Sequence, residues 1–543
     1  MLDFETSYRA MASRDSRFDG TFYVAVTTTG VYCRPVCGSR TPKRENVRFF
    51  RIAAAAGAAG FRACRRCRPE VHPSAPEWNV RGDLVARALR LIARGAVDEI
   101  GVAGVAAQLA VSERHLHRQL VAEVGVGPLA LALNRRNQVA RLLIESSALP
   151  LLDVAFAAGY SSIRQFNDGF RAAFGCSPRE LRRAGRTRPG GQGGAPPDGP
   201  GAQAGPLVLR LRYRPPLAAG ALLSWFRDRA LPGVEEVGDR RLRRALRLPR
   251  GSGRAELDLT GCRADRDAGH QQVTVRLWLS DLRDVTAAVR RCRDLLDLDS
   301  DPAAVAGTLG ADPLLGPLVR ATPGLRVPGS ADGFELAVRL LTEQYLPPAR
   351  AGQLCGWLVA RYGDPLTAPD GGPAPLFPSP AALAQADLTG ALAETAARAA
   401  TGQAAAGPHA DTATARPAAE PGAPGPGTSA ACAGVRTLAG AVAGEKLSLE
   451  RDEDREAAVA ALCGLPGVEP WTVQRIAMHV LGDPDAFDAG EPAVRAALQA
   501  LPVAPGSPPR DPDGHAHRWR PWRSYAVMHL CSAVPPPTGR QPG

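Results

Sequence analysis

A glycine- and proline-rich stretch divides this sequence and excludes a single continuous hydrophobic core. Residues 186–205 read RTRPGGQGGAPPDGPGAQAG and contain almost no apolar side chains, so we expect them to form a linker. Residues 394–434 are a second low-complexity stretch, and we expect an insertion within the C-terminal half there. At 543 residues, the chain is long enough for three or four domains.

The net charge is concentrated before the linker. The whole chain carries +12, and residues 1–200 hold 29 Arg and Lys against 17 Asp and Glu, which accounts for all of the excess. A basic segment of this kind favours a polyanionic partner such as DNA. Arginine is abundant throughout, and lysine occurs only at Lys43 and Lys446, so a compositional bias is an equally good explanation.

Neither a secretory signal nor a membrane span is expected. The first residues, MLDFETSYRA, include acidic side chains and have no apolar core. No apolar run approaches the roughly 20 residues that a membrane helix needs. We therefore expect a soluble, cytoplasmic chain in which thiols stay reduced, so that grouped cysteines are metal ligands or nucleophiles.

Four of the 11 cysteines form two close pairs, Cys33 with Cys37 and Cys64 with Cys67. At these spacings four thiolates can converge on one tetrahedral ion, and zinc suits them because it prefers thiolates and has no redox chemistry. A purely structural zinc site is the plain alternative. The remaining cysteines stand alone and are expected to be inert: Cys176, Cys262, Cys292, Cys355, Cys432, Cys463 and Cys531.

The residues around the paired cysteines are more specific than their spacing. RFDGTFYVAVTTTGVYCRPVCGSRTPKRENVRFF followed by AAGFRACRRCRPE resembles the N-terminal domain of the Ada family of methylated-DNA repair proteins. The resemblance implies a zinc domain over residues 1–78, in which Cys33, Cys37, Cys64 and Cys67 hold one Zn²⁺.

The same resemblance implies that Cys33 accepts a methyl group from a DNA methylphosphotriester. A zinc-bound thiolate stays ionised at neutral pH and remains nucleophilic, which suits attack on a methyl carbon. Methylation removes one negative charge beside the phosphate backbone, so it should tighten DNA binding. The repair step would then double as a damage sensor.

Residues 83–185 are expected to form short amphipathic helices. In VAGVAAQLAVSERHLHRQLVAEVG, Ser112 is placed to cap a helix that turns Leu116 and Leu120 inward. The outward side chains of this helix are the candidate DNA contacts Arg114, His117 and Arg118.

A similar unit follows in LPLLDVAFAAGYSSIRQFNDGFRAAFGCSPRELRR, which resembles the AraC-type DNA-binding domain with its two helix-turn-helix units. Ser161 or Ser162 would cap its second helix, and Ser162, Arg164 and Gln165 are candidate DNA contacts. The resemblance implies binding to double-stranded promoter DNA, with RNA polymerase as a further candidate partner. A helical bundle with ordinary charged faces is the alternative.

Alternating apolar residues after the linker predict strands in LVLRLRYRPP and HQQVTVRLWLS, with a helix in LAAGALLSWFRDRAL between them. From about Phe334 to residue 533 the pattern predicts helices. The fold class is therefore multidomain α+β, with an α+β domain over residues 206–320 and an all-α domain over residues 325–535.

The C-terminal segment ALCGLPGVEPWTVQRIAMHVLGDPDAFDAGEPAVRAAL resembles the helix-hairpin-helix glycosylases, specifically the AlkA branch that excises 3-methyladenine and other alkylated bases. GLRVPGSADGFELAVRLLTEQ and WRPWRSYAVMHL fit the same branch, and residues 206–300 resemble its N-terminal domain. Such an enzyme flips the base, stacks its cationic ring on aromatic side chains and stabilises the cationic sugar with a carboxylate.

The resemblance assigns roles to five residues. Glu491 aligns with the catalytic aspartate, Tyr345 stands at the position of the intercalating wedge, and Trp471 keeps its place in the base pocket. Gly467 and Glu469 belong to the DNA-binding hairpin, whose glycine allows a phosphate to approach closely.

Five positions depart from the family pattern: Glu343 and Glu469 replace glycines, Arg475 replaces a tyrosine, Cys531 replaces a tryptophan and Glu491 replaces an aspartate. A cationic Arg475 would repel cationic bases, and Glu491 is one methylene longer than aspartate. Asp488 is an alternative carboxylate, although it lies three residues earlier.

Three sequence features that the chain lacks narrow the expected enzymatic activity further. No lysine follows the hairpin, so cleavage through a lysine imine is not expected and the glycosylase is monofunctional. Cys531 stands alone, which argues against an iron–sulfur cluster. No Pro-Cys-His-Arg segment occurs, so direct repair of O6-methylguanine is not expected.

The chain is expected to be a monomer. Three hypotheses for its function follow. The first is an alkylation-damage protein that joins a suicidal methyl-accepting sensor to an active glycosylase. The second is a methyl-accepting transcription regulator whose glycosylase half only binds damaged DNA. The third is an AraC-type transcription factor with a structural zinc and no chemistry.

Overall fold

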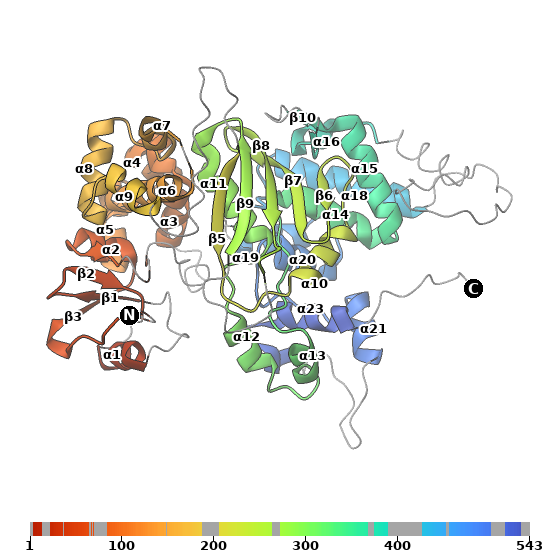
Figure 1. Ribbon diagram of the computed structural model, residues 1–543. Helices are drawn as coiled ribbons and strands as arrows, with labels where there is room; N and C mark the ends of the chain where they lie inside the picture. Colours follow the sequence, from red (N-terminus) through yellow and green to blue (C-terminus); the bar gives the residue numbers. More distant parts are fainter. Residues whose placement is uncertain are drawn as a thin grey trace. The chain divides into compact units, whose positions relative to one another are not determined.

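The structure, a computed structural model, is shown in Figure 1. It describes residues 4–13, 22–64 without 36 and 38, 67, 69, 84–186 without 148, 206–262, 272–366, 374–388, 426–451, 455–500 and 516–533. Two compact units form: Met1–Leu209 with Asp281–Ala287, and Arg210–Ser280 with Ala288–Gly543. Together they confirm the multidomain α+β class. Among the described residues, no helix is long and apolar enough to cross a membrane.

The first unit begins with a small four-stranded sheet in the order β3-β1-β2-β4. Strand β1 pairs antiparallel with both β2 and β3, whereas β2 and β4 run parallel. This parallel pairing brings the carboxyl ends of β2 and β4 to the same edge. The elements are α1 (Phe4–Ser13), β1 (Tyr23–Val26), β2 (Val31–Cys33), β3 (Val47–Phe50), α2 (Ala53–Ala58) and β4 (Arg62–Ala63).

Seven helices follow, and they contain two units of the same design. In each unit a serine caps the second helix, and a glycine in the left-handed region ends it: Ser112 and Gly125 in the first, Ser162 and Gly175 in the second. The helices are α3 (Leu84–Arg94), α4 (Ala96–Gln108), α5 (Glu113–Val124), α6 (Pro128–Ser146), α7 (Leu151–Ala157), α8 (Ile163–Phe174) and α9 (Pro178–Arg186). Residues 187–205 of the expected linker lie outside the described part of the chain.

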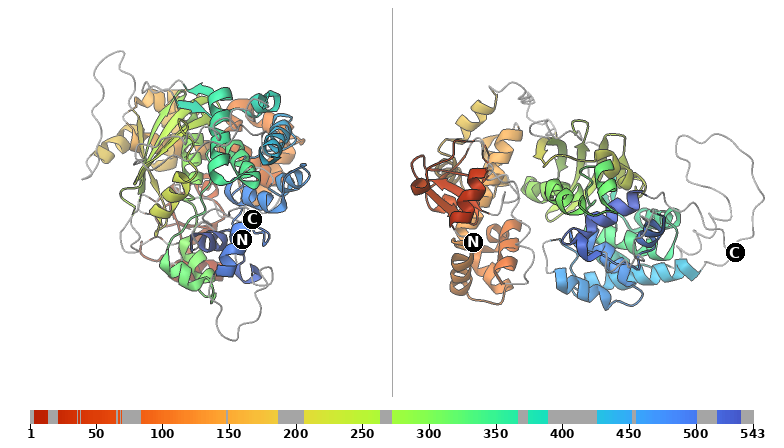
Figure 2. Two further views of the ribbon diagram at one scale, coloured as in Figure 1. Left: turned by 90° about the vertical axis from the view of Figure 1, so that its right-hand side faces the viewer. Right: turned by 90° about the horizontal axis from the view of Figure 1, so that it is seen from below.

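A five-stranded sheet in the order β5-β9-β8-β7-β6 opens the C-terminal half, and the green-to-blue helices gather on one side of it (Figure 2). Strands β5 and β9 and helix α10 confirm the elements expected from the alternating and amphipathic patterns. The strands are β5 (Leu207–Arg212), β6 (Glu235–Val237), β7 (Arg241–Leu248), β8 (Gly251–Asp258) and β9 (Gln272–Leu279). The helices packed beside them are α10 (Ala219–Arg227) and α11 (Val285–Leu295).

The remaining elements are helical, as expected from about Phe334 onward, except for a short hairpin of β10 (Asp364–Leu366) and β11 (Ala374–Leu376) that the pattern did not predict. Their shared core is built mainly of leucine, valine and alanine. The helices are α12 (Pro302–Leu309), α13 (Gly316–Ala321), α14 (Gly333–Tyr345), α15 (Pro348–Tyr362), α16 (Pro380–Gln385), α18 (Pro426–Ala443), α19 (Arg455–Cys463), α20 (Pro470–His479), α21 (Pro492–Ala500) and α23 (Arg523–Ala533).

The expected insertion at 394–434 differs from the structure at its C-terminal boundary. Residues 389–425 lie outside the described part, but residues 426–434 form the first half of α18. Ala431 is fully buried, and a side chain at Gly434 would meet Leu341 of α14 at 3.3 Å. The small residues that resemble a low-complexity stretch in the sequence therefore serve close helix packing here.

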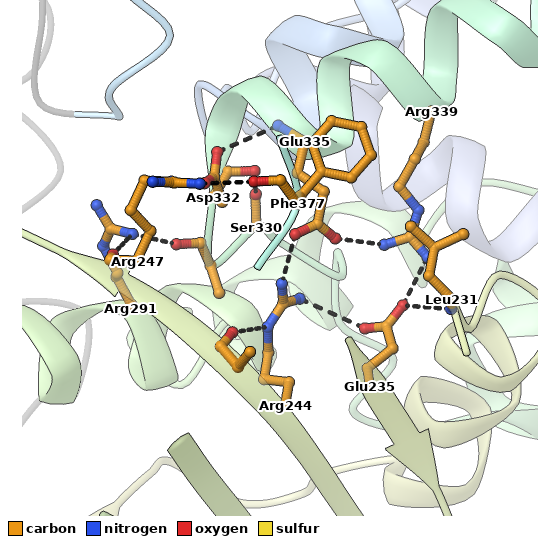
Figure 3. Close-up of polar contacts among 12 residues, drawn as sticks. Leu231, Glu235, Arg244, Arg247, Arg291, Ser330, Asp332, Glu335, Arg339 and Phe377 are labelled. Carbon is orange, nitrogen blue, oxygen red and sulfur yellow. Dashed lines mark hydrogen bonds and ion pairs between the residues drawn. The ribbon is translucent and has the colours of Figure 1, made fainter. Parts of the chain in front are cut away.

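Four buried charged side chains join the sheet to α14 (Figure 3). Arg244 of β7 lies 2.8 Å from Glu335 and 3.4 Å from Glu235 of β6. Arg339, one turn after Glu335 on α14, lies 2.8 Å from Glu335 and 2.6 Å from Glu235. Each charge thus faces two opposite charges, which compensates for its removal from water.

Candidate functional site

The four paired cysteines converge at the edge where β2 and β4 end. Their sulfur atoms all lie within 4.8 Å of one another. Cys33 ends β2, and Cys64 follows β4 and donates its backbone N–H to the Tyr32 carbonyl at 2.9 Å. The Arg34 backbone N–H points at the Cys67 sulfur at 3.4 Å, so the loop after β2 is tied to the second pair.

The electrostatics of this cluster suit a cation. Hydrogen bonding with Cys33 lowers the pKa of Cys37 and lowers the pKa of Cys64 to about 6. The same bonds, led by the one with Cys37, raise the pKa of Cys33. Four thiolates this close would repel one another, and a bound cation would offset that repulsion.

Zinc fits this donor set. Zinc–thiolate bonds of about 2.3 Å in a tetrahedron place sulfurs about 3.8 Å apart, within the separation observed here. Cys33, Cys37, Cys64 and Cys67 would hold the ion, in agreement with the expected cofactor.

The helix-turn-helix residues lie as the sequence predicts. Arg114, His117 and Arg118 are exposed on α5, and Arg118 Nη2 lies 3.2 Å from His115 Nδ1. On the opposite face of this helix Leu116 and Leu120 are fully buried. This arrangement leaves one polar face of α5 open to solvent.

The second unit repeats this layout. Arg164 and Gln165 are exposed on α8, and Arg164 is 3.9 Å from Asp168 in a weak, solvated ion pair. Ser162 accepts the Gln165 N–H at 3.2 Å, so its hydroxyl serves as the helix cap. That any of these residues contacts DNA stays a prediction.

In the C-terminal unit, the end of α14 is tied to the turn before α20. Gln344 donates to the Gly467 carbonyl at 2.9 Å and accepts the Glu469 N–H at 3.0 Å. The Tyr345 hydroxyl also donates to the Gly467 carbonyl. Gly467 adopts a φ of 81°, a conformation that favours glycine. The expected wedge residue Tyr345 is thus bonded to the hairpin in this structure.

A chain of alternating charges leads from α10 to Glu491. The Arg229 guanidinium lies 3.2 Å from Glu343, which lies 2.7 Å from Arg475. Arg475 in turn lies 3.6 Å from Glu491. All four side chains are largely shielded from solvent, with Arg229 the most exposed at 23%. Glu343 and Arg475 therefore form an ion pair with each other. They are two of the residues that the sequence resemblance predicts to differ from the family pattern.

Glu491 precedes α21 in a shielded setting. Burial raises the pKa of its carboxyl above the usual value, and the charge of Arg475 offsets part of this. Asp488 instead accepts the Gly490 N–H at 2.6 Å within its own loop. Nearby, burial raises the pKa of Cys531 to about 12, so its thiol stays protonated at neutral pH.

Aromatic rings line the same region. Trp471 and Arg475 lie one turn apart on α20, with the guanidinium carbon 5.9 Å from the Trp471 ring centroid. Trp225 of α10 lies 5.1 Å from His479, one turn beyond Arg475. The structure thus brings Trp471, Arg475 and Glu491 together, while Tyr345, Gly467 and Glu469 form the adjoining hairpin group.

Comparisons with known proteins match each part of this architecture. Three family models match: the metal binding domain of Ada at residues 6–70, a helix-turn-helix domain at residues 105–184 and the AlkA N-terminal domain at residues 208–332. Over 540 residues the chain is 44% identical to the probable bifunctional transcriptional activator/DNA repair enzyme AlkA of Mycobacterium tuberculosis, covering 99% of this chain and 98% of that protein.

The chain belongs to this bifunctional AlkA family.

Two further relatives each match one part of this bifunctional AlkA chain. Escherichia coli Ada, a bifunctional transcriptional activator/DNA repair enzyme, is 34% identical over 187 residues, which are 34% of this chain and 50% of that protein. Escherichia coli DNA-3-methyladenine glycosylase 2 is 29% identical over 330 residues, which are 60% of this chain and 96% of that protein.

Sequence reasoning missed several residues around Glu491, namely Arg229, Trp225 and His479. A signal was present in the helical spacing: Trp471, Arg475 and His479 recur every fourth residue on α20, and Glu335, Arg339 and Glu343 do so on α14. The sequence gives no sign that these two helix faces meet, because the partners are more than 100 residues apart.

Proposed function

We propose that this AlkA-family chain repairs alkylated DNA and regulates transcription in response to the damage. The observation that supports the repair activity is the convergence of four cysteine sulfurs within 4.8 Å, with Cys33 among them. Bound zinc keeps thiolates deprotonated at neutral pH. The Cys33 thiolate attacks the methyl carbon of a methylphosphotriester, forming an S–CH3 bond while the O–CH3 bond breaks and leaves a phosphodiester anion. The thioether is not reversed, so the protein is consumed.

The helix-turn-helix units would deliver this signal to promoter DNA. The polar faces of α5 and α8, with Arg114 and Arg164, are open to solvent and suited to phosphate contacts. Loss of a negative charge from the cysteine site reduces repulsion from the phosphate backbone. We infer a cytoplasmic monomer that contacts RNA polymerase at promoters; its cysteines are all free, which suits a reducing compartment.

The C-terminal half would hydrolyse the N-glycosidic bond of damaged purines such as 3-methyladenine. The base departs with the bonding electron pair, the Glu491 carboxylate stabilises the cationic sugar, and water adds to that carbon to leave an abasic site. Trp471 would stack on the flipped base. The shielded position of Glu491, which lies 3.6 Å from Arg475, supports this assignment, and the same Arg475 lies over the Trp471 ring.

A second candidate is a methyl-accepting regulator whose C-terminal half binds damaged DNA without excision. The ion pair between Arg475 and Glu491 favours it, because a carboxylate already facing a cation stabilises a second cation less well.

Intact and peptide mass spectrometry after incubation with methylphosphotriester DNA tests the methyl transfer. We expect a gain of one methyl group on the Cys33 peptide, abolished by Cys33→Ser and kept by Cys463→Ser, which removes an exposed thiol elsewhere. Retention of the gain by the Cys33→Ser protein would contradict the assignment of the acceptor.

A further inference from the structure

Two tryptophans in the region of Glu491 already carry an arginine over the ring. The Arg475 guanidinium carbon lies 5.9 Å from the Trp471 centroid, and that of Arg229 lies 4.7 Å from the Trp225 centroid. The face of an aromatic ring is where a cationic base would be attracted. Here the protein supplies its own cation to each ring.

Glu343 holds both Arg229 and Arg475 in place through ion pairs. Glu343 faces Arg475 at 2.7 Å and Arg229 at 3.2 Å, and its side chain is only 11% exposed. Moving Arg475 away would leave the shielded Glu491 without its ion pair and Glu343 with Arg229 alone, which is costly. Arg475 is therefore expected to stay beside Trp471 when a base enters.

We propose that the Glu343–Arg475 pair sets the lesion preference of the glycosylase half, which selects neutral damaged purines with a carbonyl oxygen, of the hypoxanthine type, over purines with a fixed positive charge. This inference rests on the proposed excision reaction and refines its substrate range. A guanidinium donates hydrogen bonds to a carbonyl oxygen and repels a like charge.

The carboxylate of Glu491 is itself paired with Arg475. Glu491 attracts a cationic base less strongly because Arg475 lies 3.6 Å from its carboxylate. The groups that act electrostatically on Glu491 are Arg475 of α20, Asp488 of the same loop, Arg229 after α10 and Glu343 of α14. Among these groups, Arg475 is the one that lies within ion-pair distance of Glu491.

The test is the ratio of release rates for hypoxanthine and 3-methyladenine from otherwise identical duplexes. Arg475→Met removes the cation while Glu343 keeps Arg229, and we expect the ratio to fall at least about tenfold. Arg475→Lys retains the positive charge, and its release ratio should be at least half of the wild-type ratio. If the Met protein is unfolded, Arg475→Gln replaces it, with the same expected fall.

Arg455→Met is the matched control, since Arg455 forms a similar shielded ion pair with Asp483 at 3.1 Å. It should leave the ratio unchanged. A ratio that stays within twofold of the wild type in the folded Arg475→Met protein overturns the proposal.

Release of neither base by any of these proteins would instead overturn the proposed excision. The inference is then decided by the dissociation constants for the two lesion duplexes. A fall of about tenfold in the binding preference for the hypoxanthine duplex on Arg475→Met supports it, and an unchanged preference overturns it.

Discussion

Arg475 and Glu343, which the sequence resemblance predicts to differ from the AlkA pattern, form an ion pair with each other. Without Glu343, the shielded Arg475 would face only Glu491, and without Arg475, Glu343 would face only Arg229. At 2.7 Å they satisfy each other, and Arg229 and Glu491 extend the pairing on both sides. The two residues therefore form one linked set of ion pairs with Arg229 and Glu491.

His479 gives a prediction about pH and stability at the residue scale. Its Nδ1 donates to the Pro328 carbonyl at 2.7 Å, and burial lowers its pKa to about 3. In the unfolded chain the pKa is about 6.5, so below that pH only the unfolded state gains this proton. Folding stability should fall as the pH drops from 6.5 towards 3, by about 1 kcal/mol between pH 6.5 and 5.5.

Urea unfolding followed by tryptophan fluorescence at pH 5.5 and 6.5 measures this loss. His479→Gln should remove about 1 kcal/mol of the difference between the two pH values, whereas His517→Gln, at an exposed position, should not. Burial also lowers the pKa of His529 to about 4, and its contribution is common to all three proteins. Equal pH dependence in the wild type and His479→Gln would contradict the assignment.

At the scale of elements, α14 carries the charges that join the sheet to α20. Its residues Glu335 and Arg339 meet β6 and β7, and Glu343 two turns further on meets α20. Arg339 also donates to the Arg229 carbonyl. One face of one helix therefore positions both the buried network of Figure 3 and the ion pairs that lead to Glu491.

Removing one member of the buried network should be far more damaging than removing an exposed neighbour. Arg339→Met leaves Glu235 and Glu335 to share Arg244, and we expect a loss of about 3–5 kcal/mol in the free energy of unfolding. Arg243→Met on β7 removes an ion pair with Glu256 from a half-exposed arginine and should cost less than about 1 kcal/mol. Urea unfolding of both variants decides this, and similar losses would contradict it.

The elements that sequence patterns predict well are those whose signal is local. The caps Ser112 and Ser162 and the apolar stripes of α5 and α8 lie within single helices, and they occur as expected. The β7–β8 hairpin escaped prediction because arginines crowd β7 at positions 241, 243, 244 and 247. These side chains pair with acids on other elements, among them Glu256, Glu335 and Asp364.

The same distinction applies to the candidate sites. The cysteine ligands were predictable because their spacing and flanking residues mark a metal site within 35 residues. The surroundings of Glu491 were not, because Arg229, Glu343 and Arg475 come from three separate helical regions. Helix α18 was misjudged at its start because alanine and glycine are typical both of low-complexity segments and of closely packed helices.

For the whole molecule, the net positive charge lies in the first 200 residues, which hold the methyl-acceptor and helix-turn-helix parts. If α5 and α8 both meet the backbone of promoter DNA, Arg114→Ala and Arg164→Ala should each weaken binding. Each should also make the negative slope of log affinity against log salt concentration less steep by about 1. Fluorescence anisotropy over a range of salt concentrations measures both effects.

Arg495→Ala is the control for that experiment, because Arg495 is an exposed arginine on α21 in the C-terminal half. It should leave promoter affinity and the salt slope unchanged. Unchanged slopes for Arg114→Ala and Arg164→Ala would remove α5 and α8 from the DNA interface.

The central claim is that one chain combines a methyl-accepting regulator with a working glycosylase, and base release from a damaged duplex tests it most directly. Purified protein would be incubated with duplexes containing 3-methyladenine or hypoxanthine, beside Glu491→Gln, Asp488→Asn and a sample without protein. We predict release by the wild type and by Asp488→Asn, and none above background by Glu491→Gln. Absence of release by a wild-type protein that still binds the duplex would contradict the account and leave a regulator with an inactive glycosylase fold.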